Sequence, residues 1–306
     1  MSAGGTAGRG YGRPVLVDLW LPTVNPLTTA EVLTALGPEA DQRGIHGIWV
    51  GEHVVLFDEY DSSYPYADDG RMPAAPGSGL LDPFVVLSFL AACTSRVRLG
   101  TAMALLPQRN PVYTAKEVAS IDYLSNGRVD LGVGVGWLRE EFEALNVPWP
   151  RRGARADEYL EILRALWCEE VSSYDGEFHQ LPQCRMDPKP VQTPHPPIHI
   201  GGESDAALRR VARAAQGWMT FNRRPGDLAE PLKRLDELLA EHGRARSDIE
   251  VTACPYFKEF APDDVEAFAE AGAARIAVLF IAADPDGVRS GLDALEPVLE
   301  RARALA

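Results

Sequence analysis

Eight short β-type segments alternate with eight helix-type segments along the chain, and this alternation constrains the fold more than any other feature. We predict strands at residues 15–21, 47–50, 97–106, 129–135, 198–200, 218–221, 249–252 and 276–281. Several of these segments are continuously apolar, which is typical of parallel strands buried on both faces. Repeated βα units predict an all-parallel α/β fold, and eight of them favour a closed (β/α)8 TIM barrel.

An open, doubly wound Rossmann-like sheet is the main alternative fold. Its fingerprint is a glycine-rich turn after the first strand, where the pyrophosphate of a dinucleotide binds. Here the first predicted strand leads instead into residues 22–26, which read Pro-Thr-Val-Asn-Pro. The sequence therefore favours the barrel.

The length of 306 residues suits one large domain or two modest ones. We expect residues 1–13, which are rich in Gly and lack an apolar segment, to be a disordered arm rather than a secretory signal. Residues 14–306 would then form a single barrel domain. No apolar run reaches the ~20 residues that span a bilayer. The four cysteines are scattered without metal-ligand spacing, so we expect reduced, mostly buried cysteines in a cytoplasmic protein.

The charge balance limits the classes of partner. The chain has 30 Lys plus Arg against 44 Asp plus Glu, a formal net charge of −14 at pH 7. A field of this sign repels nucleic-acid phosphates and anionic membrane surfaces. We therefore expect neither kind of partner, although a local basic pocket for one phosphorylated cofactor remains compatible with this charge.

Two long segments interrupt the βα pattern. Residues 54–81 follow the second predicted strand and carry three tyrosines, whereas residues 168–197 precede the fifth strand and are rich in Pro and Gln. Loops of this length in a compact domain are usually functional or disordered. Because residues 54–81 leave the C-terminal end of a strand, we expect them to cover the active-site face of the barrel. Residues 168–197 enter a strand and are expected to cover a barrel end or side, or an interface.

Catalytic groups of a barrel lie at the C-terminal ends of its strands. The second predicted strand ends at Glu52-His53. A carboxylate beside an imidazole can supply a proton donor or acceptor near neutral pH. A purely structural polar pair at the start of a loop is the alternative interpretation, and the residues alone leave both open.

Glycines and small residues gather at the ends of three other strands. Gly132, Gly134 and Gly136 alternate along the fourth strand, and Gly201-Gly202 separate the fifth strand from a helix; the third strand ends in a run of small residues. Missing side chains let a ligand approach the backbone, and a helix N-terminus behind glycines can bind an anion. Tight packing inside the barrel is the alternative for the glycine strand.

The remaining candidates point to an organic cofactor rather than to a metal or a nucleophile. His199 lies between isoleucines in a strand and is best interpreted as a buried or hydrogen-bonded structural histidine. The sequence contains no HExxH motif, Walker loop or nucleophile elbow. A barrel mouth with one acid/base pair and much exposed backbone suits a bound group that brings its own chemistry.

In combination, these segments resemble the luciferase-like monooxygenase family, over roughly residues 15–218. The resemblance is carried, in order, by residues 94–101, 109–111, 124–128, 132–137, 140–145, 152–155, 188–192 and 196–202. It is closest to the branch that depends on the deazaflavin coenzyme F-420. Trp137 stands where some sugar dehydrogenases of that branch have a second acid, which argues against a sugar-phosphate substrate.

The resemblance implies roles for the strand-end residues. His53 would face the reactive ring of the cofactor, with Glu52 orienting or tuning it. Ala102-Met103 would form a cis non-prolyl peptide at a bulge beneath the central ring. Gly134 and Gly136 would line the cofactor, and the backbone of Gly201 and Gly202 would contact its tail.

The resemblance thus implies hydride transfer between coenzyme F-420 and a small organic substrate, with His53 handling the accompanying proton and residues 54–81 as a lid. A two-component monooxygenase that uses reduced FMN and O2 with a flavin reductase partner is the second hypothesis. A non-enzymatic flavin-binding protein for storage or sensing is the third. The family also leads us to expect a homodimer.

Overall fold

The computed structural model describes residues 15–305, so the predicted arm at residues 1–13 lies outside the described residues. The strands of the main sheet follow one another around a closed parallel barrel, because β3 pairs with both β2 and β5. The predicted (β/α)8 barrel is confirmed. Its strands are β1 (Leu16–Leu21), β2 (Gly47–Val50), β3 (Arg98–Thr101), β4 (Ala104–Leu105), β5 (Val129–Gly134), β8 (Ile198–Gly201), β9 (Gly217–Phe221), β10 (Glu250–Cys254) and β11 (Arg275–Leu279).

Seven of the eight predicted strands match observed ones to within two residues at each end. The segment at residues 97–106 is the exception, since it is divided into β3 and β4, which share one barrel position beside β5. The Ala102–Met103 peptide lies at the break and is cis, as the family resemblance implied. This irregularity directs the backbone into the barrel mouth.

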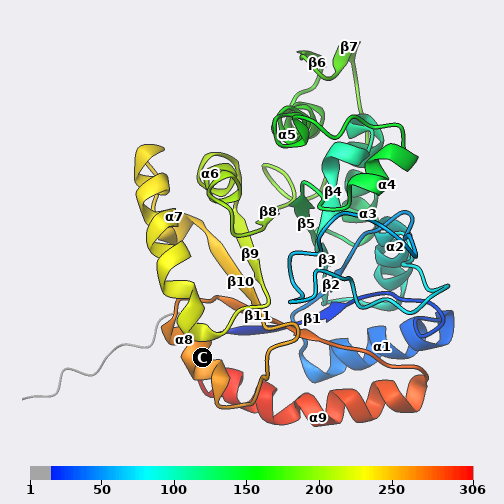
Figure 1. Cartoon of the computed structure of the whole chain (residues 1–306), viewed down its shortest axis with the longest axis vertical. Helices are drawn as coiled ribbons and strands as arrows, with labels where there is room; N and C mark the ends of the chain where they lie inside the picture. The colour runs from blue at the N-terminus through cyan, green and yellow to red at the C-terminus, as the bar shows by residue number, and fades with distance from the viewer. Residues whose placement is uncertain (1–14, 306) are drawn as a thin grey trace, which may run out of the picture.

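The helices pack outside the barrel (Figure 1), and their apolar residues and the outward-facing side chains of the strands form one large buried core. Helices α1 and α9 lie side by side along one edge of the molecule. The helices are α1 (Ala30–Arg43), α2 (Pro83–Cys93), α3 (Pro111–Leu124), α4 (Arg139–Ala144), α5 (Arg152–Cys168), α6 (Asp205–Ala214), α7 (Ala229–Glu241), α8 (Asp264–Glu270) and α9 (Pro285–Ala304). Within residues 15–305, no helix is both long and apolar enough to cross a bilayer.

The long segment at residues 168–197 contains a two-stranded antiparallel hairpin that the sequence did not indicate, β6 (Ser172–Asp175) and β7 (Gln180–Cys184). The hairpin lies on the outer side of α5 (Figure 1), where the backbone N–H groups of Glu177 and His179 at its turn donate to the Glu158 carboxylate. The rest of the segment returns along the barrel side, where the backbone N–H groups of Val191 and Gln192 donate to the buried Asp122 carboxylate. It therefore covers a side, one of the expected positions.

The interior of the barrel below the mouth contains a cluster of buried charged side chains. The Arg275 guanidinium donates to the Asp130 carboxylate at 2.8 Å, and the Trp49 indole donates to Asp18 at 2.6 Å. Burial alone raises the pKa of Asp130, but Arg275 and Arg98 outweigh burial and hold that pKa well below its ordinary range. These ionised pairs give the barrel floor a fixed arrangement.

The environments predicted for His199 and for the four cysteines are confirmed only in part. His199 is buried as predicted, but neither of its ring nitrogens has a hydrogen-bond partner among the described residues. All four cysteines are free, yet only Cys254 is fully buried, and Cys168 is exposed. The reduced state follows the prediction, whereas the expected burial holds for one of the four.

Candidate active site

A cavity of about 490 Å³ opens at the C-terminal mouth of the barrel. This volume is in the range that organic ligands occupy in proteins. All eight residues that the sequence singled out line the cavity: Glu52, His53, Ala102, Met103, Gly134, Gly136, Gly201 and Gly202. The strand ends therefore come together as the barrel topology requires, although lining a cavity does not by itself assign a role.

The backbone around the cis peptide forms one wall of the cavity, which we call the bed (Ala102–Met103 with Gly134 and Gly201). The carbonyl oxygen of Ala102 accepts a hydrogen bond of 3.2 Å from the Trp20 indole. A Cβ atom on Gly201 would lie 2.6 Å from Cγ of Met103, and one on Gly134 would lie 3.0 Å from its Cβ. Both glycines therefore leave room for the Met103 side chain.

Gly132 of β5 and Gly136, which follows this strand, are glycines for different structural reasons. A Cβ atom on Gly132 would lie 1.9 Å from the carbonyl oxygen of Thr101, so tight barrel packing explains this glycine. Gly136 adopts φ 80°, a left-handed conformation that favours glycine, and it lies against Phe142. The packing alternative is therefore correct for Gly132, whereas Gly134 and Gly136 line the cavity.

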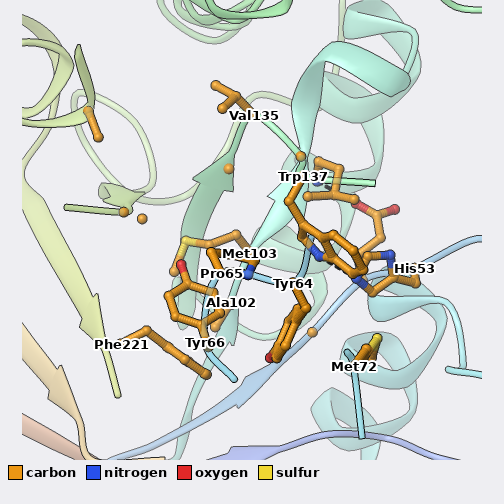
Figure 2. A pocket seen from close by; sticks show the side chains of 18 of the residues that line it. His53, Tyr64, Pro65, Tyr66, Met72, Ala102, Met103, Val135, Trp137 and Phe221 are labelled. Carbon is orange, nitrogen blue, oxygen red and sulfur yellow. Dashed lines mark hydrogen bonds between the residues drawn. The ribbon is translucent and has the colours of Figure 1, made fainter. Parts of the chain in front are cut away.

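His53 is held from both sides of its ring. Its Nδ1 lies 3.1 Å from the Glu141 carboxylate, and its Nε2 lies 3.2 Å from Nε1 of Trp137. Because an indole N–H only donates, Nε2 must be the accepting nitrogen, and the ring proton is therefore on Nδ1. Figure 2 shows the rings of His53 and Trp137 next to each other at one side of the cavity.

Glu141 was missed by the sequence reasoning. It lies on α4, is fully buried, and accepts hydrogen bonds from His53, the backbone of Val54 and the side chain of Gln108. It thereby fixes both the ring of His53 and the start of the loop that follows. A fully buried carboxylate that gathers several donors is a positioning group for the histidine.

The expected pairing of Glu52 with His53 is wrong. The Glu52 carboxylate instead accepts from the Arg109 guanidinium at 2.7 Å and from the backbone N–H of Leu105 at 2.6 Å. Consecutive residues of an extended backbone point to opposite sides, which separates the two neighbours. Burial raises the pKa of Glu52, and Arg109 partly opposes this. Glu52 thus braces the backbone just after the bed.

The far end of the cavity, which we call the anion end, consists of the start of α6 and Arg152. Gly202 adopts φ 105°, and the Ser204 side chain caps α6, whose first-turn residues Ala206 and Ala207 line the cavity. Arg152 also lines it, with its guanidinium 3.6 Å above the Trp149 ring and no carboxylate within salt-bridge distance among residues 15–305. Its Nε donates to the carbonyl of Gly136 at 3.2 Å. A helix N-terminus and a guanidinium without a carboxylate partner both attract a phosphate.

Glu203 lies next to this anion end, where a free carboxylate would repel a phosphate. Its carboxylate turns away to accept hydrogen bonds from the backbone N–H of Phe221 at 2.7 Å and from the hydroxyl of Thr220 at 3.1 Å. Burial raises its pKa, and these hydrogen bonds act in the opposite direction. The negative charge is therefore tied to β9.

Residues 54–81, the lid loop, cover the mouth as expected. The hydroxyl of Tyr64 lies 3.1 Å from that of Tyr256, and the carbonyl of Tyr66 accepts from the Asn222 side chain at 3.0 Å. Tyr66 also packs on Phe221 of β9. Figure 2 shows Tyr64, Tyr66 and Met72 of this loop directed into the same space as His53. The loop therefore bridges the mouth from β2 to the opposite strands.

Comparison with known proteins agrees with this geometry. The luciferase-like monooxygenase family model matches residues 18–301. An uncharacterized protein of Mycobacterium tuberculosis is 39% identical over 206 residues, which are 67% of this chain and 72% of that protein. An FMNH2-dependent dimethylsulfone monooxygenase of Pseudomonas putida is 32% identical over 186 residues, or 59% of this chain and 50% of that protein.

The fold is also shared with a solved F420-dependent secondary alcohol dehydrogenase. That likeness has a TM-score of 0.74 and covers 95% of this chain and 99% of the other, at 15% sequence identity. At this identity the likeness shows the fold alone. The family match, by contrast, extends over nearly all of the described residues, and we conclude that the chain belongs to the luciferase-like monooxygenase family.

Proposed function

We propose that the chain is an oxidoreductase that transfers a hydride between coenzyme F-420 and a small organic substrate, with His53 as the proton donor or acceptor. The observation that carries this proposal is the two-sided fixation of His53, beside the bed and under the lid loop. A histidine fixed by a buried carboxylate and exposed to a ligand cavity is suited to general acid–base catalysis.

The cavity fits a flavin-type cofactor. The bed (Ala102–Met103 with Gly134 and Gly201) is a wall in which the Met103 side chain lies against the two glycines, and a flat ring could lie on it. Arg152 and the start of α6 would hold the phosphate that both FMN and the deazaflavin carry. When bound, a deazaflavin gives or takes a hydride, whereas reduced FMN activates O2.

The chain's own part is to move a proton at Nε2 of His53. This atom accepts the Trp137 N–H, so it can take up a proton only when the indole turns away. The loss of this hydrogen bond costs about 1 kcal/mol, an amount that substrate binding can offset. Glu141 keeps its hydrogen bond to Nδ1 and would stabilise the imidazolium that forms.

A second candidate is a two-component monooxygenase that uses reduced FMN supplied by a flavin reductase. The observation that favours it is the similarity to an FMNH2-dependent monooxygenase at 32% identity. His53 would then exchange a proton with the substrate or with the reduced oxygen, and Glu141 would hold its ring as before. The cofactor, rather than the residues, distinguishes the two candidates.

Equilibrium titration distinguishes the candidates. The purified protein is titrated with coenzyme F-420 and with FMN, each oxidised and reduced, and with the variants Arg152→Ala and Arg209→Ala. We expect micromolar binding of the deazaflavin, about tenfold weaker in Arg152→Ala and unchanged in Arg209→Ala, whose side chain is exposed on α6. Binding of reduced FMN alone would establish the second candidate, and binding of neither cofactor would refute both.

We also propose that the protein is a homodimer that uses α2 and α3. These helices pack side by side, and they expose Val85 and Phe89 on α2 and Tyr113, Tyr123 and Leu124 on α3. Exposed apolar residues gathered on neighbouring helices are typical of subunit interfaces. Sedimentation equilibrium should give a dimer that Leu124→Arg dissociates; a monomeric wild-type protein at micromolar concentration would contradict this.

A further inference from the structure

We infer that the substrate of this site is an uncharged aromatic compound that carries an oxygen acceptor. The inference rests on the proposed function, because it concerns the part of the cavity that the bed and the anion end leave free. This part lies between the lid loop and the ends of β1, β9 and β10. Six aromatic rings line it: Trp20, Tyr64, Tyr66, Trp137, Phe221 and Tyr256.

The free part of the cavity contains no side chain that would pair with an ionised substrate. The lining has two arginines, Arg152 at the start of α5 and Arg210 in the middle of α6, and Arg210 pairs with Asp157. His53 is neutral in the observed hydrogen-bonding arrangement. An anionic substrate group here would lose its water without a partner, which strongly disfavours binding.

A cationic substrate is disfavoured because the nearby carboxylates already have partners. Glu52 lines the cavity but is neutralised by Arg109, and Glu203 is occupied by Thr220 and the backbone of β9. Aromatic rings alone can attract a cation through their faces. Here they largely contact one another edge to face, so a cation would meet ring edges as well as faces.

The aromatic rings form a connected wall suited to another ring. Trp20 contacts Tyr256 and Phe221 with centroid separations of 5.1 and 5.2 Å and nearly perpendicular planes. Tyr64 contacts Trp137 at 5.1 Å, and Tyr66 contacts Phe221 at 5.0 Å. Such edge-to-face and tilted arrangements stabilise aromatic neighbours beyond the burial of apolar surface. An aromatic substrate would extend this network, whereas a saturated one would gain burial alone.

The hydroxyl pair of Tyr64 and Tyr256 supplies the polar contact. The Tyr64 hydroxyl donates to that of Tyr256 across 3.1 Å, so Tyr256 keeps its own proton for a third group. Burial raises the pKa of Tyr256 to about 12, so that this phenol is protonated at neutral pH. The spare O–H selects a substrate with a carbonyl, ether or phenol oxygen.

A matched set of probes tests the inference by binding alone. We would measure the affinity of 2-naphthol, 2-naphthoate, decahydro-2-naphthol and N-methylquinolinium by calorimetry. The protein would be saturated with whichever cofactor binds, or used without cofactor if neither binds. Failure of the cofactor proposal therefore leaves this test intact. We expect 2-naphthol to bind best, about tenfold tighter than decahydro-2-naphthol and at least about 100-fold tighter than 2-naphthoate.

Two variants separate the oxygen contact from the ring contacts. The double variant Tyr64→Phe/Tyr256→Phe should weaken 2-naphthol about tenfold and leave naphthalene unchanged, because it removes both hydroxyls and keeps both rings. Phe221→Ala should weaken both aromatic probes together. Equal or tighter binding of 2-naphthoate or N-methylquinolinium would overturn the uncharged substrate class. Equal binding of the saturated probe would overturn the aromatic class. An equal change in the affinity of 2-naphthol and naphthalene in the double tyrosine variant would overturn the oxygen contact.

Discussion

Replacing Glu141 by glutamine should change which nitrogen of His53 carries the proton. One carboxylate oxygen accepts the backbone N–H of Val54, while the other faces Nδ1 of His53 and the amide of Gln108. An amide has a single accepting oxygen, which should stay with the backbone donor. Its NH2 group would then face His53 and Gln108, which are donors in the wild-type protein.

The surroundings can adapt only in part. The Gln108 amide can turn over, since its own oxygen has no partner among the described residues. His53 can accept from the new amide only by moving its proton to Nε2, which then opposes the N–H of Trp137. One hydrogen bond is lost, and the remaining hydrogen bonds of residue 141 no longer involve an ionised group. We therefore expect the free energy of unfolding to fall by about 2–3 kcal/mol.

Two measurements check this prediction. Urea unfolding followed by circular dichroism gives the free energy, and 15N NMR of imidazole-labelled protein gives the His53 tautomer. The control is Glu143→Gln on the same helix, whose exposed ion pair with Arg139 should contribute less than about 0.5 kcal/mol. If Glu141→Gln kept the Nδ1–H tautomer and lost no more stability than the control, the assignment of Glu141 as the positioning residue would be refuted.

Three further predictions follow from the same structure. His53→Ala should lower turnover by about 100-fold or more and change the cofactor Kd less than threefold; a loss of turnover below tenfold would remove the proton-transfer role. Gly132→Ala should lower the free energy of unfolding by about 3 kcal/mol, because its Cβ would collide with the Thr101 carbonyl, whereas Gly226→Ala, with open space around it, should have almost no effect in the same urea titration. Burial lowers the pKa of His199 to about 4. Between pH 6.5 and 4 this histidine is therefore protonated in the unfolded chain but neutral in the folded protein. Stability should therefore fall as pH decreases from 6.5 to 4, by roughly 3 kcal/mol, and His199→Phe should flatten the profile in this window; an unchanged slope would contradict the assignment.

The barrel was predictable because its signal is local and repeated. Each strand is a short apolar segment, and parallel pairing of eight such segments leaves few arrangements. The hairpin β6–β7 was not predictable in the same way, because its strands are polar and largely exposed, without a clear alternation. The division of residues 97–106 into two strands was signalled by the family resemblance and not by residue types.

The site was predictable as a set of positions but not as a set of contacts. Strand ends meet at the barrel mouth, which is why the eight chosen residues share one cavity. The partner of His53 could not be found by adjacency, since Glu52 points to the other side and Glu141 comes from a helix 88 residues away. The sequence did offer a signal for Glu141, because it lies in the first turn of α4, directly after β5, and this turn lies at the barrel mouth.

The most direct test of the account is a crystal structure of the protein with the cofactor that binds more tightly. We predict that the ring system lies on the Ala102–Met103 bed with its reactive edge facing His53, and that the phosphate lies between Arg152 and the start of α6. A ring bound elsewhere, or a phosphate remote from Arg152, would contradict the proposed function at its centre.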